Sequence, residues 1–112
     1  MNLTQLIDTM SLEKVCGDRD PEISGVYVGD FLSRAMSKVE SGNVWVTIMA
    51  NTNVVAVASL TDCACILLAE GVTLQKEALE AAIENDIVVL SSKNSAYKLC
   101  LELGEKLGAS VE

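Results

Sequence analysis

Apolar residues recur along the chain at two different spacings, which predict helices and strands in turn. Spacing of three to four residues predicts a short amphipathic helix over 4–10. Short runs of β-branched and aromatic residues predict strands over 13–16 and 25–28. The second strand leads into a helix indicated by the apolar residues between 31 and 39. We therefore expect a strand that feeds directly into a helix near the start of the chain.

The pattern becomes more regular after residue 41. Buried strands are predicted over 44–49, 65–69 and 87–90. A helix capped by Thr73 is predicted over 74–85, and a last helix begins near 91–94 and ends at Gly108. The buried side of that last helix is expected to contain Tyr97, Cys100, Leu101 and Leu107.

The segment 51–62 has conflicting signals. Its valines favour a strand by propensity, whereas its place between two strands favours a helix that Asn53 caps and that reaches Leu60. Strands and helices would then alternate, which predicts right-handed crossovers in an α/β fold. A mainly parallel or mixed sheet flanked by helices, built from successive βα units, is therefore expected. The alternative is a hairpin at 51–53 within an antiparallel meander.

Length and charge limit the classes of partner. A chain of 112 residues, half of them apolar, is long enough for one core, so a single domain over 1–112 is expected. The 16 acidic residues outnumber the 8 basic ones and give a net charge of -8. Neither nucleic acid nor an anionic membrane surface suits that charge. A cytoplasmic location is expected, because no secretory signal or membrane span is recognisable.

The chain is poor in catalytic side chains. It contains no histidine, which removes the commonest general base and zinc ligand, and it contains no phosphate-binding P-loop motif. Cys63 and Cys65 are expected to be buried thiols on one face of a strand rather than a metal or redox pair. A non-enzyme without a cofactor or metal is therefore predicted.

Two loops at strand ends could bind a ligand. One contains Gly29 and Asp30, and the other contains Asn51, Thr52 and Asn53. Loops at the carboxyl ends of parallel strands are the usual ligand sites, and N–H groups at a helix start suit an anion or a nucleotide phosphate. Helix capping is the competing interpretation, since Asn, Thr and Asp are common caps.

The chain has more apolar side-chain surface than one small sheet is expected to bury. Trp45 and Thr47 share one strand face, and Met36, Met49 and the apolar run 54–58 add to that surface. Part of this surface is expected to lie between subunits, which favours a homodimer over a monomer with a large core.

Three stretches carry a family resemblance that spans nearly the whole chain. They are ISGVYVGDFLS at 23–33, WVTIM at 45–49 and ASLTDCACILLAEGV at 58–72. In order and spacing they resemble the DRTGG-domain family. The resemblance implies a small α/β module, similar in fold to the amino-terminal domain of HPr kinase/phosphorylase, found alone or fused to CBS pairs. Such modules are regulatory or dimerising and are not catalytic.

The motif that names the family is absent from this chain. The aligned region 50–53 reads Ala-Asn-Thr-Asn, so an arginine and two glycines are missing. The resemblance implies a non-catalytic regulatory or protein-interaction module that acts as a homodimer. The alternative it implies is a small-molecule sensor that binds an adenine nucleotide or another anion at the two strand-end loops.

Overall fold

The computed structural model describes residues 1–108, in which helices and strands alternate along most of the chain. In chain order the elements are α1 (Leu3–Met10), β1 (Glu13–Cys16), β2 (Gly25–Val28), α2 (Leu32–Lys38), β3 (Asn43–Thr47), α3 (Thr52–Thr61), β4 (Cys65–Leu68), α4 (Lys76–Glu84), β5 (Val89–Ser91) and α5 (Ala96–Leu107).

The strands form one five-stranded sheet in the order β1-β5-β4-β3-β2. The four strands from β2 to β5 are parallel and pair in chain order, β2 with β3, β3 with β4 and β4 with β5. The strand β1 is antiparallel to β5 and forms one edge of the sheet, while β2 forms the other. The expected α/β domain with a mainly parallel, mixed sheet is therefore confirmed.

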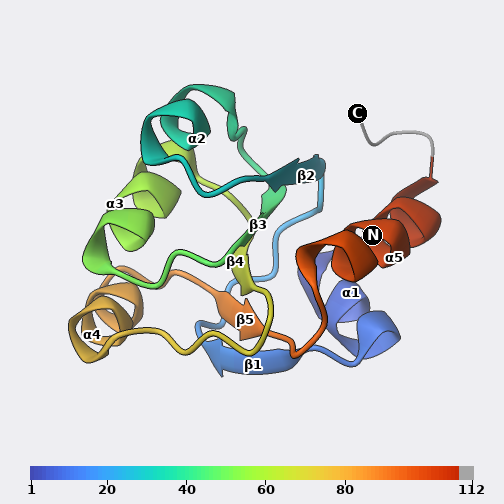
Figure 1. Cartoon of the computed structure of the whole chain (residues 1–112). Helices are drawn as coiled ribbons and strands as arrows, with labels where there is room; N and C mark the ends of the chain where they lie inside the picture. The colour runs from blue at the N-terminus through green and yellow to red at the C-terminus, as the bar shows by residue number, and fades with distance from the viewer. Residues whose placement is uncertain (109–112) are drawn as a thin grey trace.

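The helices cover the sheet in two layers of unequal size. Each crossover from β2 to β5 moves one strand in the same direction, so connections of one hand place α2, α3 and α4 on the same face. Figure 1 shows these three helices on one side of the sheet and α1 with α5 on the other. Side chains of β3 alternate between the layers: Trp45 packs toward α2–α4, while Val44 and Val46 pack toward α1 and α5.

The apolar surface around Trp45 and Thr47 was expected to lie partly between subunits, and this expectation is wrong. Trp45 is fully buried, Thr47 is 2% exposed, and the valines of α3 lie in the same core. The Trp45 indole N–H donates to the Gly29 carbonyl at 3.0 Å, which satisfies its polar atom inside the protein. Three helices on this face hide the surface that the sequence pattern assigned to a partner; of that group, Met36 remains half exposed.

Residues 52–61 form a helix, as the spacing predicted, and the hairpin alternative is wrong. Asn51, two residues before the predicted Asn53, provides the cap, and its side chain accepts from the N–H groups of Asn53 and Val54. The helix forms despite its β-branched residues because Val54, Val55 and Val57 are all buried against the sheet and its neighbours.

Two helices differ from their predictions. In α5 the buried stripe is Leu99 and Leu103, whereas Tyr97 and Leu101 are 74% and 56% exposed. Both pairs have four-residue spacing, so the sequence pattern did not distinguish the inner pair from the outer one. Gly108 ends this helix as predicted. The helix α4 begins after Gln75, and Thr73 does not cap it.

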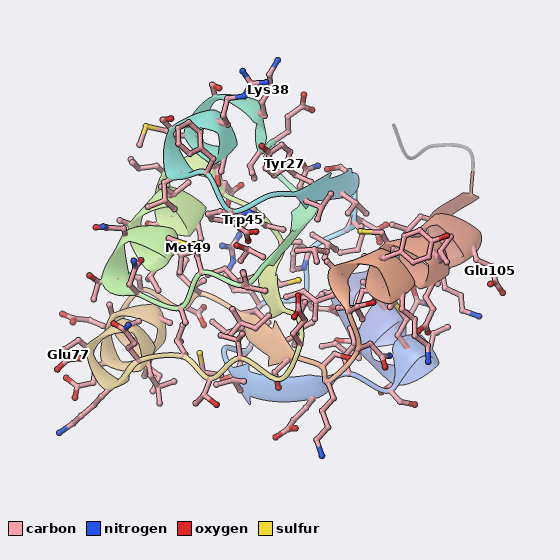
Figure 2. The ribbon with its side chains drawn as sticks, viewed as in Figure 1. Tyr27, Lys38, Trp45, Met49, Glu77 and Glu105 are labelled. Carbon is pink, nitrogen blue, oxygen red and sulfur yellow. The ribbon has the colours of Figure 1, made fainter. Side chains whose placement is uncertain are left out.

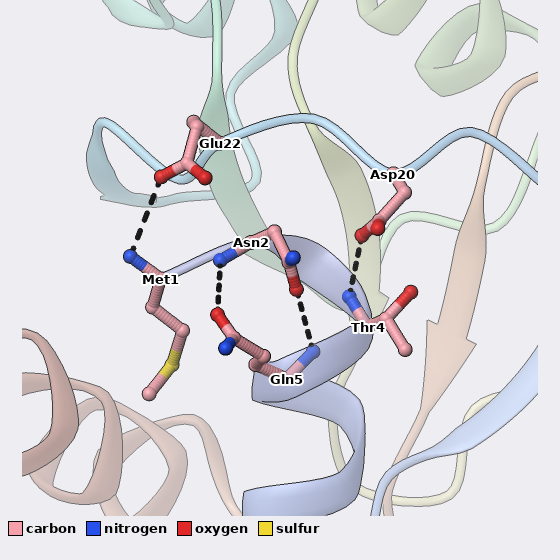
Figure 3. A network of polar contacts seen from close by, with 6 residues as sticks. All are labelled: Met1, Asn2, Thr4, Gln5, Asp20 and Glu22. Atoms are coloured by element: carbon pink, nitrogen blue, oxygen red, sulfur yellow. Dashed lines mark hydrogen bonds and ion pairs between the residues drawn. The ribbon is translucent and has the colours of Figure 1, made fainter.

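Polar contacts join the first helix to the segment between β1 and β2 (Figure 3). Asn2 and Gln5 form a reciprocal capping box at the start of α1. The Thr4 N–H donates to the Asp20 carboxylate at 2.7 Å, and the amino group of Met1 lies 3.4 Å from the Glu22 carboxylate. Among the described residues, no helix has the length and hydropathy to cross a membrane.

Candidate functional site

The two predicted ligand loops lie at the carboxyl ends of neighbouring strands. Gly29 and Asp30 follow β2, and Asn51 lies four residues beyond the end of β3. Asp30 joins the two strand ends, because its carboxylate accepts from the Thr47 hydroxyl at 2.7 Å and from the Ile48 N–H at 2.8 Å. The expected helix cap at Asp30 is wrong, since Phe31 stands at the N-cap of α2 and no side chain caps it.

Structural hydrogen bonds already use several polar groups of these loops. The N–H of Gly29 donates to Val46, and its carbonyl accepts from Trp45. The Asn51 amide oxygen accepts two helical N–H groups of α3. The side chains of Thr52 and Asn53 are exposed at the start of that helix. These bonds fix the shape of the loops, while the proposed ligand role of the five residues remains a prediction.

A crevice opens elsewhere, where the connections leave the sheet in opposite directions. The chain leaving β4 turns to α4 on one face, and the chain leaving β5 turns to α5 on the other. In open α/β sheets ligands bind at such a reversal. Here a cavity of about 460 Å³, which we call the β4/β5 crevice, lies beside these strand ends. Its polar lining consists of Glu13, Lys14, Thr73, Ser91, Ser92 and Lys93.

This crevice is not among the sites predicted from the sequence. Lys14 and Lys93 are far apart in the chain, and the antiparallel return of β1 to β5 brings their segments together. The available signal was the Ser91-Ser92-Lys93-Asn94 stretch, which was predicted only to open the last helix. Its N-cap is Ser95 instead, which leaves the stretch before it as a loop on the crevice.

A second cavity lies along the free edge of β2. It has a volume of about 480 Å³ and is lined by Ser24, Gly25, Val26, Tyr27, Lys38, Glu40 and Asn43. We call it the β2 groove. Figure 2 shows Tyr27 and Lys38 at this end of the molecule and Trp45 further inside. Among residues 1–108, no strand pairs with the outer side of β2.

The cysteines have the environment of structural thiols. Burial raises the pKa of Cys63 to about 11 and raises the pKa of the fully buried Cys65 well above its ordinary value. Both are buried as predicted, but Cys63 precedes β4 and packs toward α2–α4, whereas Cys65 packs toward α1 and α5. The expectation that they share a face is therefore wrong. No cluster of metal-ligating side chains occurs in the described part of the chain.

The ion pair between Arg19 and Asp62 is accompanied by a hydrogen bond from the Ser41 hydroxyl. The Ser41 hydroxyl donates to the Asp62 carboxylate at 2.8 Å, and Arg19 donates to the other carboxylate oxygen at 3.1 Å. Both hydrogen bonds lower the pKa of Asp62, and the bond from Ser41 has the larger effect. The Arg19 bond fastens the segment between β1 and β2 to the carboxyl end of α3, and the Ser41 bond fastens the turn between α2 and β3 to the same place.

Comparison with known proteins supports the fold and leaves the ligand open. No protein-family model and no curated protein sequence matches this chain. A crystal structure of the CBS and DRTGG domains of the regulatory region of Clostridium perfringens pyrophosphatase, complexed with the activator diadenosine tetraphosphate, matches with a TM-score of 0.65 and 17% identity. The match covers 88% of this chain and 44% of that one, so our chain spans less than half of its length. The comparison supports a DRTGG-like fold.

Proposed function

From the DRTGG-like fold and an open sheet edge, we propose that this chain is a non-catalytic regulatory or protein-interaction module of the cytoplasm. It acts as a homodimer whose subunits meet along β2. The similar fold occurs in the regulatory region of a pyrophosphatase, which supports a regulatory role. The lack of histidine and of a P-loop motif in the sequence supports a role without catalysis.

The observation that carries the proposal is the free edge of β2. The N–H of Gly29 donates to Val46, so the alternation of a parallel ladder directs the backbone groups of Val26 and Val28 away from the sheet. The strand carries no charge, and Val28 is 51% exposed. Unpaired and uncharged strand edges of this kind accept another strand.

A second copy of β2 is the partner that fits this edge. Pairing of two identical strands across a two-fold axis is self-complementary, because each copy offers the same donors and acceptors to the other. The β2 groove contributes one cation, Lys38, and one anion, Glu40. Such a groove can pair opposite charges with its own copy, even though each chain has a net charge of -8.

Lysine substitutions at the two sheet edges test this proposal. Val28 on β2 and Val15 on β1 are both exposed valines on edge strands, at 51% and 38%. We expect light scattering to show a dimer for the unmodified chain and for Val15→Lys, and a monomer for Val28→Lys, because an edge lysine opposes strand addition. Circular dichroism checks that both variants fold. A monomer at high micromolar concentration for the unmodified chain would contradict the proposal.

A second candidate function is a small-molecule sensor that binds an adenine nucleotide or another anion. Two observations favour it: the similar structure was solved with a dinucleoside polyphosphate, and Asp30 holds the β2 and β3 ends together. The residues proposed for binding are Gly29, Asp30, Asn51, Thr52 and Asn53. Calorimetry with AMP, ADP, ATP and diadenosine tetraphosphate tests it, and heat that disappears in Asn53→Ala supports this site.

A further inference from the structure

We propose that the β4/β5 crevice binds a small phosphomonoester that carries a planar or apolar group. This site is separate from the β2 edge and from the loops at Gly29 and Asn51. It lies where the connections after β4 and β5 diverge to opposite faces of the sheet, the place at which α/β sheets receive ligands. Its volume of about 460 Å³ falls within the range of small-molecule sites.

The walls of the crevice are fixed by backbone hydrogen bonds. The Glu70 N–H donates to the Asn94 carbonyl at 2.8 Å, and the Gly71 N–H donates to the Ser92 carbonyl at 2.9 Å. The Ser92 N–H in turn donates to Leu68 at 3.0 Å. Glu70 and Gly71 both have positive φ, so the chain turns sharply here without leaving the edge of the sheet. A preformed site loses less conformational entropy when it binds a ligand.

The crevice offers hydrogen-bond donors that the protein does not use itself. Within residues 1–108, Lys93 makes no ion pair, and the hydroxyls of Thr73 and Ser91 make no hydrogen bond. Lys14 lies opposite Leu90 in the antiparallel ladder, on the α1/α5 side of the sheet, and its ammonium lies 3.7 Å from the Asp18 carboxylate, so we do not count it among these donors. Ser92 accepts a hydrogen bond from Asn94, so its own hydroxyl proton remains available. Ammonium and hydroxyl donors are the groups that bind phosphate.

The crevice lacks the excess of negative charge that the whole chain carries. The charges of its lining balance, because Lys93 stands against Glu13 and Lys14 is paired with Asp18. The chain as a whole has a net charge of -8, which repels anions from most of its surface. Binding must therefore depend on Lys93, and Glu13 must oppose it.

The remaining wall of the crevice is apolar. It consists of Val15, Val72, Leu74 and Leu79. Leu74 is 7% exposed and Leu79 is partly buried, so this wall continues into the core beneath α4. A ligand with one anionic end and one planar or apolar end would place each against a matching wall.

Phenyl phosphate is a direct probe, because it joins a planar ring to a phosphate. In an amide NMR titration we expect shifts at Gly71, Thr73, Ser92 and Lys93, and weaker binding of inorganic phosphate or phenol alone. Lys93→Gln should weaken binding roughly tenfold, since a hydrogen bond to a charged group is lost. Glu13→Gln should tighten binding.

Lys98→Gln is the matched control, because Lys98 is an exposed lysine on α5 that does not line the crevice. It should leave the affinity unchanged. Three outcomes would overturn the proposal: no shifts at millimolar phenyl phosphate, shifts confined to the Gly29 and Asn51 loops, or an affinity that Lys93→Gln does not alter. Light scattering of the same samples reports the dimer separately, so either proposal can fail without the other.

Discussion

The two edges of the sheet are built in opposite ways. The strand β1 has the sequence Glu-Lys-Val-Cys, and its register with β5 shifts between Lys14 and Cys16. The strand β2 has the sequence Gly-Val-Tyr-Val and pairs with β3 in unbroken register. Charges and bulges are the devices by which proteins prevent strand addition, and β1 has both. The strand β2 has neither, which is the reason for proposing it as the dimer edge.

The β1 edge is also the more tightly constrained of the two. Gly17 follows β1 with a φ of +94°, and a Cβ there would lie 2.6 Å from the Val88 Cα. At Gly25, the first residue of β2, a Cβ would lie 3.3 Å from the side-chain nitrogen of Asn43. The first neighbour is backbone and cannot move away, whereas the second is a side-chain end that is hydrogen-bonded to Ser24 and has to give by only a few tenths of an ångström. The two edges therefore differ in charge and also in how well they tolerate a larger residue in place of glycine.

Alanine at these two glycines should give the largest difference between the edges. Gly17→Ala should lower the free energy of unfolding by about 3 kcal/mol, because it combines left-handed strain with a backbone clash. Gly25→Ala should change it by less than about 1 kcal/mol. Urea unfolding followed by circular dichroism measures both. Equal losses in the two variants would show that the edges are equally constrained.

Removal of a carboxylate near each edge should give a smaller difference. Asp30→Ala should cost about 2 kcal/mol, because the Thr47 hydroxyl and the Ile48 N–H lose their acceptor at the β2 end. Asp18→Ala removes only the exposed 3.7 Å ion pair with Lys14 and should cost less than about 0.5 kcal/mol. The same urea titration compares them. A cost for Asp18→Ala that matches Asp30→Ala would contradict this view of the β1 side.

The smallest expected effect is the contribution of Asp62 to the pH dependence of the free energy of unfolding. Hydrogen bonds from Ser41 and Arg19 lower the pKa of Asp62, so its carboxylate stabilises the fold above the unfolded pKa and stops doing so as pH falls through the folded pKa. Asp62 is exposed, which keeps the effect small. Unfolding measured between about pH 5 and pH 2 should show the difference between the chain and Asp62→Asn shrinking in acid. A constant difference would contradict it.

The order of strands and helices was predictable because each element carries its own periodicity. The helical assignment of 52–61 followed from the alternation of strands and helices, although its valines argued otherwise. The inner face of α5 was not predictable from periodicity, because Tyr97 and Leu101 have the same spacing as the buried Leu99 and Leu103. The burial of Trp45 required the knowledge that three helices share one face, which depends on strand order.

The candidate sites depended still more on topology. The loops at Asp30 and Asn51 could be found because each is a local pattern at a strand end. The β4/β5 crevice joins Lys14 to Lys93 across the antiparallel pairing of β1 with β5. Likewise, the sequence of β2 does not predict that this strand lies at the edge of the sheet. Both features follow from the arrangement of strands and not from any contiguous motif.

The pairing of β1 with β5 also has a consequence for the order of folding. Every parallel pair joins strands that are neighbours in the chain, whereas Lys14 pairs with Leu90 from the far end of the sequence. Closing that long loop costs more chain entropy than any of the βα steps, so β1 should join the sheet last. During synthesis, the strand that is made first would wait until β5 emerges. Until then the N–H and C=O groups on the outer edge of β5 stay unpaired, and the arrival of the charged β1 closes an edge on which other chains could aggregate.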